Sequence, residues 1–185
     1  EACAHHLYFN ESDYETLGAL IKCNPAIKKA QDQKALLRAV NDDVIDVIAT
    51  DHAPHTWEEK QNPYFSAPSG LPLVQDALLS LLEYYHEGVF SLEKIVSKTS
   101  HSVAELFGVK DRGYIREGCW ADIVLVDLNK PRGATEILSK CAWSPFEGVQ
   151  FKSSIWATIV NGQIIYQDGQ IISDTIGKPL EYARD

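Results

Sequence analysis

The chain has 185 residues, of which 45% are hydrophobic and 10% are aromatic. These values are typical of a folded globular protein with one or two domains, and they exclude an intrinsically disordered chain. The formal net charge of -9 argues against nucleic-acid binding, which needs a basic surface. No apolar run reaches the roughly 18 residues of a membrane-spanning helix. We therefore expect neither nucleic acid nor a membrane as a partner.

The four cysteines are widely spaced and include no Cys-x-x-Cys pair. An even number permits two disulfides, but the globular composition favours four reduced thiols, and we expect a cytoplasmic protein. The sequence contains no methionine, not even at position 1. We expect it to be a piece of a longer polypeptide.

The first forty residues are predicted to contain one extended segment and two helices. Residues 1–9 are a strand or an extended entry, and residues 12–20 are a short helix. Ser12 and Glu15 have the spacing of a capping box at the start of this helix. An apolar stripe predicts a second helix over residues 31–41.

The most informative segment is residues 45–55, an apolar run that ends in Asp-His-Ala-Pro-His. Such a run is typical of a strand buried on both faces, and Pro54 ends it because proline lacks an N–H donor. Asp51 and His55 are thereby predicted to lie at the carboxyl end of a buried strand, where catalytic groups collect in α/β folds. This pattern suits metal-assisted hydrolysis. The alternative is a helix N-cap Asp with exposed histidines.

Residues 56–70 are irregular, and a loop of this length in a compact domain is usually a lid or a binding loop. A strong helix is expected over residues 72–86, with Gly88 as its stop. Further helices are predicted to begin at Ser91 and at Ser102, the latter with a Ser-x-x-Glu capping pattern. Up to this point, helix and buried strand alternate as in a βα barrel.

The end of the chain has the pattern of a small antiparallel β unit. Strands are predicted at residues 121–128, 154–160 and 163–166. Asn161-Gly162 is a strong hairpin turn between the last two, and Asp168-Gly169 is a second turn. The sequence therefore predicts two parts, which are residues 1–112 and residues 113–185.

In these segments the chain closely resembles the dihydroorotases of the amidohydrolase superfamily. The resembling segments are Ala-His-His-Leu at 4–7, Lys-Cys-Asn-Pro-Ala-Ile-Lys at 22–28, Asp-His-Ala-Pro-His at 51–55, Ala-Pro-Ser-Gly at 67–70 and Trp-Ser-Pro-Phe-Glu-Gly at 143–148, with residues 118–126 and 160–162 in the tail. Together they cover essentially the whole chain. A lone Asp-His pair would be weak evidence for this resemblance, but Asp-His-Ala-Pro-His with a downstream Pro-Phe-Glu-Gly is specific evidence for it.

The resemblance implies the C-terminal part of a (β/α)₈ barrel, followed by strands of a small β-sandwich domain. It implies a binuclear zinc site and the reversible cyclisation of N-carbamoyl-L-aspartate to L-dihydroorotate in pyrimidine biosynthesis. Asp51 corresponds to a zinc ligand that also carries the proton. Asn24 and His55 correspond to substrate-binding positions, and Ser69 and Gly70 to a turn that contacts the pyrimidine ring.

The other zinc ligands of the family have no counterpart in this sequence. A complete barrel needs about 250 residues, and one carboxylate cannot hold two zinc ions. We therefore expect the chain by itself to be inactive. A partial barrel would expose strand edges and apolar helix faces, so we also expect a homo-oligomer or association with a complementing N-terminal fragment.

Two other functions fit the same residues. One is another cyclic amidohydrolase, such as an allantoinase or a dihydropyrimidinase-like enzyme. The other is a non-catalytic, dihydroorotase-like scaffold subunit, although such proteins tend to lose metal ligands and Asp51 and His55 are present here.

Several further polar residues are given structural interpretations. Adjacent strand residues point to opposite faces, so at most one of His5 and His6 faces a site, and the resemblance makes neither a zinc ligand. His52 is expected to point away from Asp51. Asp76 is assigned to the solvated face of its helix, and Glu58 and Glu59 are expected to pair with Lys60 or with a mobile lid.

Overall fold

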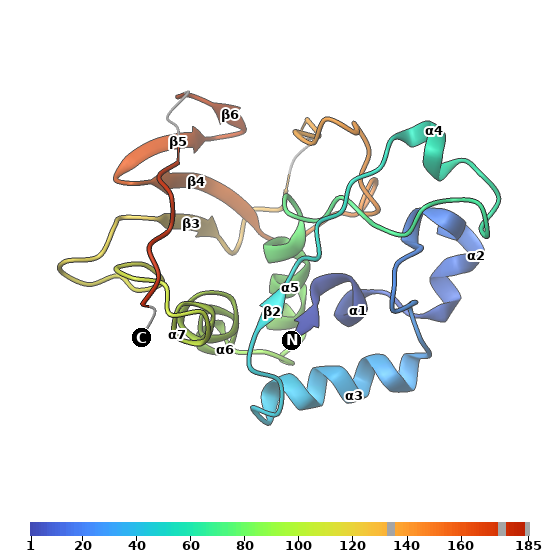
Figure 1. The fold of residues 1–185 in the computed structure, drawn as a ribbon, viewed down its shortest axis with the longest axis horizontal. Coiled ribbons are helices and arrows are strands. Elements are labelled where there is room, and N and C mark those ends of the chain that lie inside the picture. The colour runs from blue at the N-terminus through green and yellow to red at the C-terminus, as the bar shows by residue number, and fades with distance from the viewer. Residues whose placement is uncertain (133–135, 174–176, 184–185) are drawn as a thin grey trace. The chain divides into compact units, whose positions relative to one another are not determined.

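A computed structural model describes residues 1–132, 136–173 and 177–183 of the chain (Figure 1). The chain divides into two compact units, one formed by Glu1–Phe90 with Glu136–Val149, and the other by residues 91–135 with 150–185. None of the helices in the described part of the chain combines the length and the apolarity needed to cross a membrane.

The first unit contains a two-stranded parallel sheet with helices packed around it (Figure 1). Its elements are β1 (Ala2–Cys3), α1 (Ala4–Tyr8), η1 (Glu11–Asp13), α2 (Tyr14–Leu17), η2 (Gly18–Ile21), α3 (Ala30–Asn41), β2 (Ile48–Ala49), α4 (Trp57–Lys60) and α5 (Ala77–His86). Ala2 pairs with Ile48 and Cys3 with Ala49. Parallel pairing needs a crossover connection, which here includes α3. The expected α/β class is confirmed.

The strand that precedes Asp51 is much shorter than predicted. Val44 is 74% exposed, whereas Val47 and Ile48 are buried. The backbone N–H groups of Val44 and Ile45 both donate to the Ala39 carbonyl, so the start of the apolar run closes the C-terminus of α3. Only its last residues remain to form β2.

The beginning of the chain also differs from the prediction, because only Ala2–Cys3 are a strand and a helix follows at once. Helix α1 buries His5 completely, and this burial lowers the pKa of His5 to about 4, so the ring is neutral at pH 7. The predicted capping pair of Ser12 and Glu15 is wrong. Asn10 and Asp13 form the reciprocal cap instead.

Two helices of the first unit can be compared with the bounds predicted from the sequence pattern. Helix α3 agrees with the predicted residues 31–41 to within one residue. Helix α5 begins at Ala77, five residues later than predicted, and Gly88, with a φ of 71°, follows its end as expected. Asp76 is not on a solvated face. Its side chain is buried and accepts a hydrogen bond of 2.6 Å from Ser144 Oγ.

The second unit begins with one nearly continuous helical run made of α6 (Leu92–Val96), η3 (Ser97–His101) and α7 (Ser102–Leu106). Ser91 caps α6 as predicted, because its Oγ accepts the Lys94 N–H. Ser102 does not start a separate helix. The run reaches it through a π-helical turn, so its backbone is already helical.

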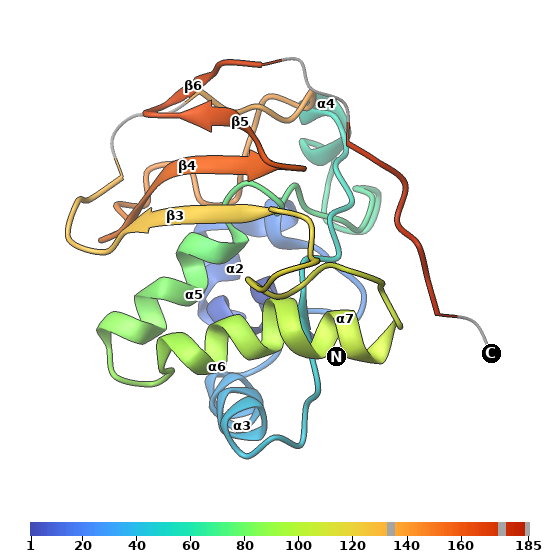
Figure 2. The same cartoon turned by 90° about the vertical axis from the view of Figure 1, so that its left-hand side faces the viewer.

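The second unit also contains the predicted antiparallel sheet, drawn from yellow to red in Figure 2. Its strands are β3 (Ile123–Asp127), β4 (Ser154–Val160), β5 (Gln163–Gln167) and β6 (Gln170–Ile171), in the order β3-β4-β5-β6. Asn161 and Gly162 have φ values of 51° and 81°. A two-residue hairpin turn with both central residues at positive φ is the type I′ turn that Asn-Gly favours.

Candidate functional site

Asp51 lies two residues beyond β2, at its carboxyl end, as the sequence predicted. Its side chain is exposed, and its backbone has a φ of 49°. This left-handed conformation is uncommon outside glycine, and Asp and Asn are among the residues that tolerate it. The turn after the strand therefore presents the carboxylate to solvent.

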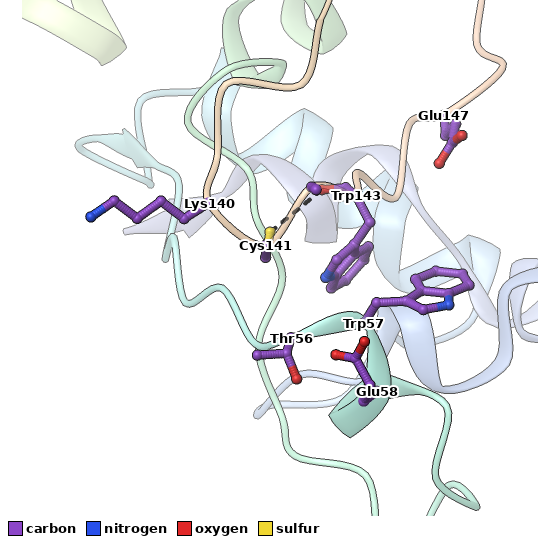
Figure 3. A pocket seen from close by; sticks show the side chains of 8 residues that line it. Thr56, Trp57, Glu58, Lys140, Cys141, Trp143 and Glu147 are labelled. Carbon is purple, nitrogen blue, oxygen red and sulfur yellow. Dashed lines mark hydrogen bonds between the residues drawn. The ribbon is translucent and has the colours of Figure 1, made fainter.

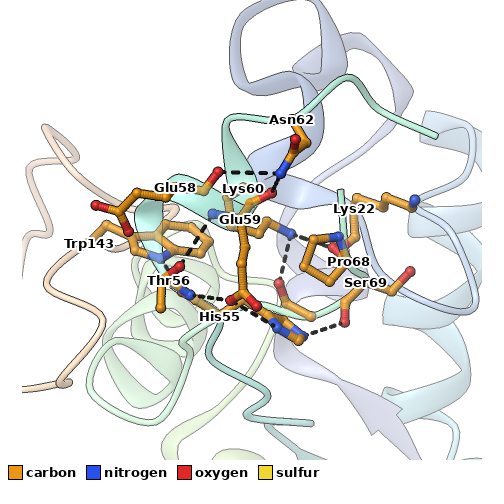
Figure 4. A network of polar contacts seen from close by, with 11 residues as sticks. Lys22, His55, Thr56, Glu58, Glu59, Lys60, Asn62, Pro68, Ser69 and Trp143 are labelled. Atoms are coloured by element: carbon orange, nitrogen blue, oxygen red, sulfur yellow. Dashed lines mark hydrogen bonds and ion pairs between the residues drawn. The ribbon is translucent and has the colours of Figure 1, made fainter. Parts of the chain in front are cut away.

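His55 and Ser69, two predicted substrate-binding residues, lie side by side in the first unit (Figure 4). His55 Nε2 is 3.1 Å from the Ser69 carbonyl oxygen, which can only accept, so the proton of this bond is on Nε2. His55 Nδ1 is 3.6 Å from Glu59 Oε2. The Thr56 backbone N–H, aided by the Thr56 hydroxyl and by His55, holds the pKa of Glu59 below its usual value. An ionised carboxylate thus stands next to the imidazole.

Gly70 occupies a position that only glycine fits. Its φ is 138°, and a Cβ added there would lie 2.4 Å from the Ala53 carbonyl oxygen. Its N–H donates to the Lys22 carbonyl over 2.9 Å. The missing side chain thus lets the Ser69-Gly70 turn pack directly on the Asp-His-Ala-Pro-His segment.

Lys60 stabilises the Ser69-Gly70 turn through hydrogen bonds to backbone carbonyls. Its side chain is 2% exposed, and its Nζ donates to the carbonyls of Gly70 at 2.9 Å, Pro68 at 3.1 Å and Lys22 at 3.4 Å (Figure 4). Burial lowers the pKa of Lys60 to about 8. The expected pairing of Glu58 and Glu59 with Lys60 is wrong, because the ammonium group is directed at backbone oxygens.

Lys22 and Trp143 complete the support of the loop. Lys22 Nζ donates to the carbonyls of Tyr64 and Ala67 over 2.7 and 2.6 Å. The buried Trp143 donates its indole N–H to the His55 carbonyl over 2.8 Å, and its ring centroid is 5.8 Å from Lys60 Nζ. The sequence signal for these roles is an irregular loop at residues 56–70, whose buried carbonyls lack strand partners and need side-chain donors.

His52 has a structural role, as expected. Its Nδ1 accepts hydrogen bonds from the backbone N–H groups of Leu73 at 2.9 Å and Val74 at 3.1 Å. The His52 ring therefore stabilises the backbone segment that leads into α5.

Asn24 is exposed and precedes a cis peptide bond to Pro25. It lies two residues after Lys22, whose carbonyl binds both Gly70 and Lys60. In the described ranges, no hydrogen bond joins the side chain of Asn24 or of Asp51 to the other predicted site residues. The structure thus brings His55, Ser69 and Gly70 together and leaves Asn24 and Asp51 exposed.

Among the residues that the structure describes, none joins Asp51 in a group with metal-binding spacing. Among the described residues, one group of three His, Cys, Asp or Glu side chains has the spacing to hold a metal ion, and it consists of Cys3, His5 and His6. Asp51 is outside that group.

An open depression of about 590 Å³ lies next to the loop (Figure 3). Its lining residues are Thr56, Trp57, Glu58, Lys140, Cys141, Ala142, Trp143 and Glu147. None of the predicted site residues lines it. The candidate site is therefore an exposed surface of the first unit and not this depression.

The sequence matches the model of the Amidohydrolase family over residues 1–165. It is 38% identical over 181 residues to a dihydroorotase of Halobacterium salinarum, covering 96% of this chain and 42% of that protein. It is 36% identical over 183 residues to an allantoinase of Desulfitobacterium hafniense, covering 97% and 41%. The chain thus spans about two fifths of the length of these relatives.

The fold is similar to that of a solved L-hydantoinase (dihydropyrimidinase) from Arthrobacter aurescens, with a TM-score of 0.85. The similarity covers 92% of this chain and 39% of the hydantoinase chain, at 24% sequence identity. The arrangement of elements described above is therefore that of part of a hydantoinase-like fold.

We expect Gly70→Ala to destabilise the first unit. The positive φ alone costs about 1–3 kcal/mol for an alanine, and the contact of the new methyl group with the Ala53 carbonyl adds to this cost. Urea denaturation followed by circular dichroism measures the effect. Gly177→Ala, where an added Cβ meets no atom within 4 Å, is the control and should change stability little. Equal stability of the two variants would contradict the steric requirement.

We expect Lys60→Met to change how stability depends on pH. The folded-state pKa of about 8 lies below the unfolded value of about 10.4, so between these values the unfolded chain binds more protons, and Lys60 makes stability rise with pH. The unfolding free energy of the wild type minus that of the variant should therefore increase from pH 8 upward. The exposed Lys34→Met is the control. A difference that stays constant from about pH 7 to about pH 10 would contradict the lowered pKa.

Proposed function

We propose that this chain, which belongs to the amidohydrolase family, forms part of a dihydroorotase. The enzyme would interconvert N-carbamoyl-L-aspartate and L-dihydroorotate, with loss of water in the direction of ring closure. Pyrimidine biosynthesis in the cytoplasm is the corresponding role. The proposal rests on the residues that the sequence shares with this family and on the way the loop is built around His55.

The observation that carries the proposal is the arrangement of His55, Ser69 and Gly70. The histidine is fixed by the Ser69 carbonyl, and Gly70 allows the backbone to approach the strand-end segment closely. A turn with exposed polar groups suits a small ring that carries an amide and a carboxylate. We propose that Asn24 and His55 bind the polar groups of the substrate and that Ser69 and Gly70 contact its ring.

Asp51 is the proposed proton-transfer group. Ring closure removes a proton from the ureido nitrogen, and ring opening returns it, so the group must act as base and as acid. A carboxylate that is exposed at the end of β2, as Asp51 is, can accept and release a proton in this way. His52 is occupied with the backbone of residues 73–74, which leaves Asp51 as the general acid and base.

The described residues do not supply the ligands of the binuclear zinc site that the family implies. Asp51 is the one predicted ligand, and the single His/Cys group with metal-binding spacing among the described residues excludes it. The proposed activity therefore belongs to a longer protein, consistent with the two fifths of the relatives' length that the chain spans. By itself the chain is expected to be inactive.

We further propose that residues 1–112 are the C-terminal part of a (β/α)₈ barrel and that residues 113–185 contribute strands to a small β-sandwich domain. The parallel pairing of β1 with β2 supports the first assignment. The antiparallel sheet from β3 to β6 supports the second.

Allantoinase is the second candidate, because the allantoinase relative is nearly as similar to this chain as the dihydroorotase. The two substrates are both cyclic amides, but they differ in ring size and in charge. A non-catalytic scaffold is disfavoured by the presence of Asp51 and His55.

We expect the full-length protein to hydrolyse L-dihydroorotate faster than allantoin. Asp51→Asn should lower kcat by roughly 10²–10⁴-fold, since an amide cannot transfer the proton. Ultraviolet absorbance of the ring measures turnover, and the exposed Ser66→Ala is the control. Preference for allantoin would favour the second candidate. An Asp51→Asn variant with full activity would remove Asp51 from the mechanism.

Association with a second copy or with a complementing N-terminal fragment remains a prediction. Apolar side chains such as Phe65, which is 95% exposed, and Val74, which is 62% exposed, support it. Sedimentation velocity of the 185-residue chain should show a dimer or larger species at micromolar concentration. A compact monomer at all concentrations would contradict the prediction.

A further inference from the structure

The junction of β1 and α1 brings three soft metal-binding groups together. Cys3 ends the strand, and His5 and His6 lie in the helix that begins at Ala4. One potential ligand atom from each of the three side chains lies within 4.8 Å of the other two. None of these residues has a part in the proposed dihydroorotase chemistry.

The two ring nitrogens of His5 are buried without a regular hydrogen bond. The side chain is fully buried. The ring lies close to the Thr50 backbone, but neither Nδ1 nor Nε2 forms a hydrogen bond of normal geometry. Buried polar atoms of folded proteins almost always have a partner, and an exception calls for a specific explanation. A metal ion bound to one of these nitrogens would supply that partner.

His6 is already oriented as metal-binding histidines usually are. Its Nε2 lies 2.8 Å from the Pro25 carbonyl oxygen, which can only accept, so this nitrogen carries the proton. Histidine ligands commonly donate one ring N–H to a backbone carbonyl and bind the metal through the other nitrogen. The Pro25 contact thus leaves Nδ1 of His6 as the ligand atom.

The chemistry of the three groups selects the ion. A thiolate and two imidazoles suit Zn²⁺ and other borderline or soft cations, whereas Mg²⁺ and Ca²⁺ require oxygen ligands. Tetrahedral zinc with Zn–N and Zn–S bonds of about 2.0–2.3 Å has neighbouring ligand atoms roughly 3.3–3.6 Å apart. The present spacing of up to 4.8 Å therefore needs the side chains to move together by about an ångström when the ion binds.

We propose that Cys3, His5 and His6 form a zinc site, with a fourth position left to water or to another ligand. Asp51 does not belong to the cluster, although its carboxylate lies close enough to act on the Cys3 thiol. The site would join the end of β1 to the first turn of α1 and would satisfy the buried imidazole of His5. It would lie beside the strand that leads to the catalytic segment, since Cys3 pairs with Ala49, two residues before Asp51.

Co²⁺ is the probe for this site, because a cobalt ion bound by a thiolate has a sulfur-to-metal charge-transfer band in the near ultraviolet. Titration of the metal-free, reduced 185-residue chain with CoCl₂ should produce this band with one equivalent of Co²⁺. Addition of ZnCl₂ should abolish it. Cys3→Ser should remove the band, and His5→Gln or His6→Gln should weaken Co²⁺ binding by at least tenfold.

Matched variants separate this site from other thiols and from the proposed catalytic carboxylate. Cys119→Ser and Cys141→Ser replace the two half-buried cysteines outside the cluster and should leave the band unchanged, as should Asp51→Asn. Circular dichroism checks the fold of each variant. If His5→Gln does not fold, the comparison of Cys3→Ser with the two cysteine controls still shows whether the band comes from this site. The absence of a band, a band that survives Cys3→Ser, a band lost in Cys23→Ser alone, or a band lost in Asp51→Asn would overturn the proposal.

Discussion

The candidate site depends on one buried ammonium group, that of Lys60. Three segments of the chain meet at it, because its Nζ binds the carbonyls of Lys22, Pro68 and Gly70 while the Trp143 ring lies close by. A charge inside a protein is tolerated when dipoles of the right sign surround it, and backbone carbonyls provide such dipoles without any counter-ion. The irregular loop gains in return the hydrogen-bond donors that no neighbouring strand supplies.

The residues proposed to bind substrate and those proposed to bind zinc differ in how far this chain supports them. The groups assigned to substrate recognition are supported entirely within the first unit, through His55 and the Ser69-Gly70 turn. The groups that would hold the catalytic zinc ions are not, since Asp51 has no companion ligands in the described part of the chain. Under the proposed function, the residues for substrate positioning lie in this chain, whereas the described residues supply no companion ligands for Asp51.

The sequence predicts a structural feature correctly where residues close together in the chain determine it. Helix α3 and the Asn161-Gly162 hairpin follow from side-chain periodicity and from residues that accept a positive φ, and both are confirmed. The turn after β2 was placed correctly for the same reason. The length of β2 was not, because the Ala39 carbonyl at the end of α3 binds the residues that were expected to begin the strand.

Other features depend on partners far away in the sequence, and local patterns could not indicate them. Asp76 looks like a surface residue until Ser144 is placed against it, and Lys60 looks like half of a surface ion pair until the loop carbonyls surround it. In both cases a charged side chain is buried because a distant segment supplies hydrogen bonds. The burial of such a side chain therefore cannot be predicted from its neighbours in the sequence.

The left-handed backbone at Asp51 limits the amino acids that evolution can sample there. A φ of 49° disfavours β-branched and bulky residues, whereas Gly, Asn and Asp adopt it with little backbone strain. Among these three, only Asp carries an ionisable group. The turn geometry thus favours a small set of residues at position 51, and the proposed proton-transfer residue is one of them.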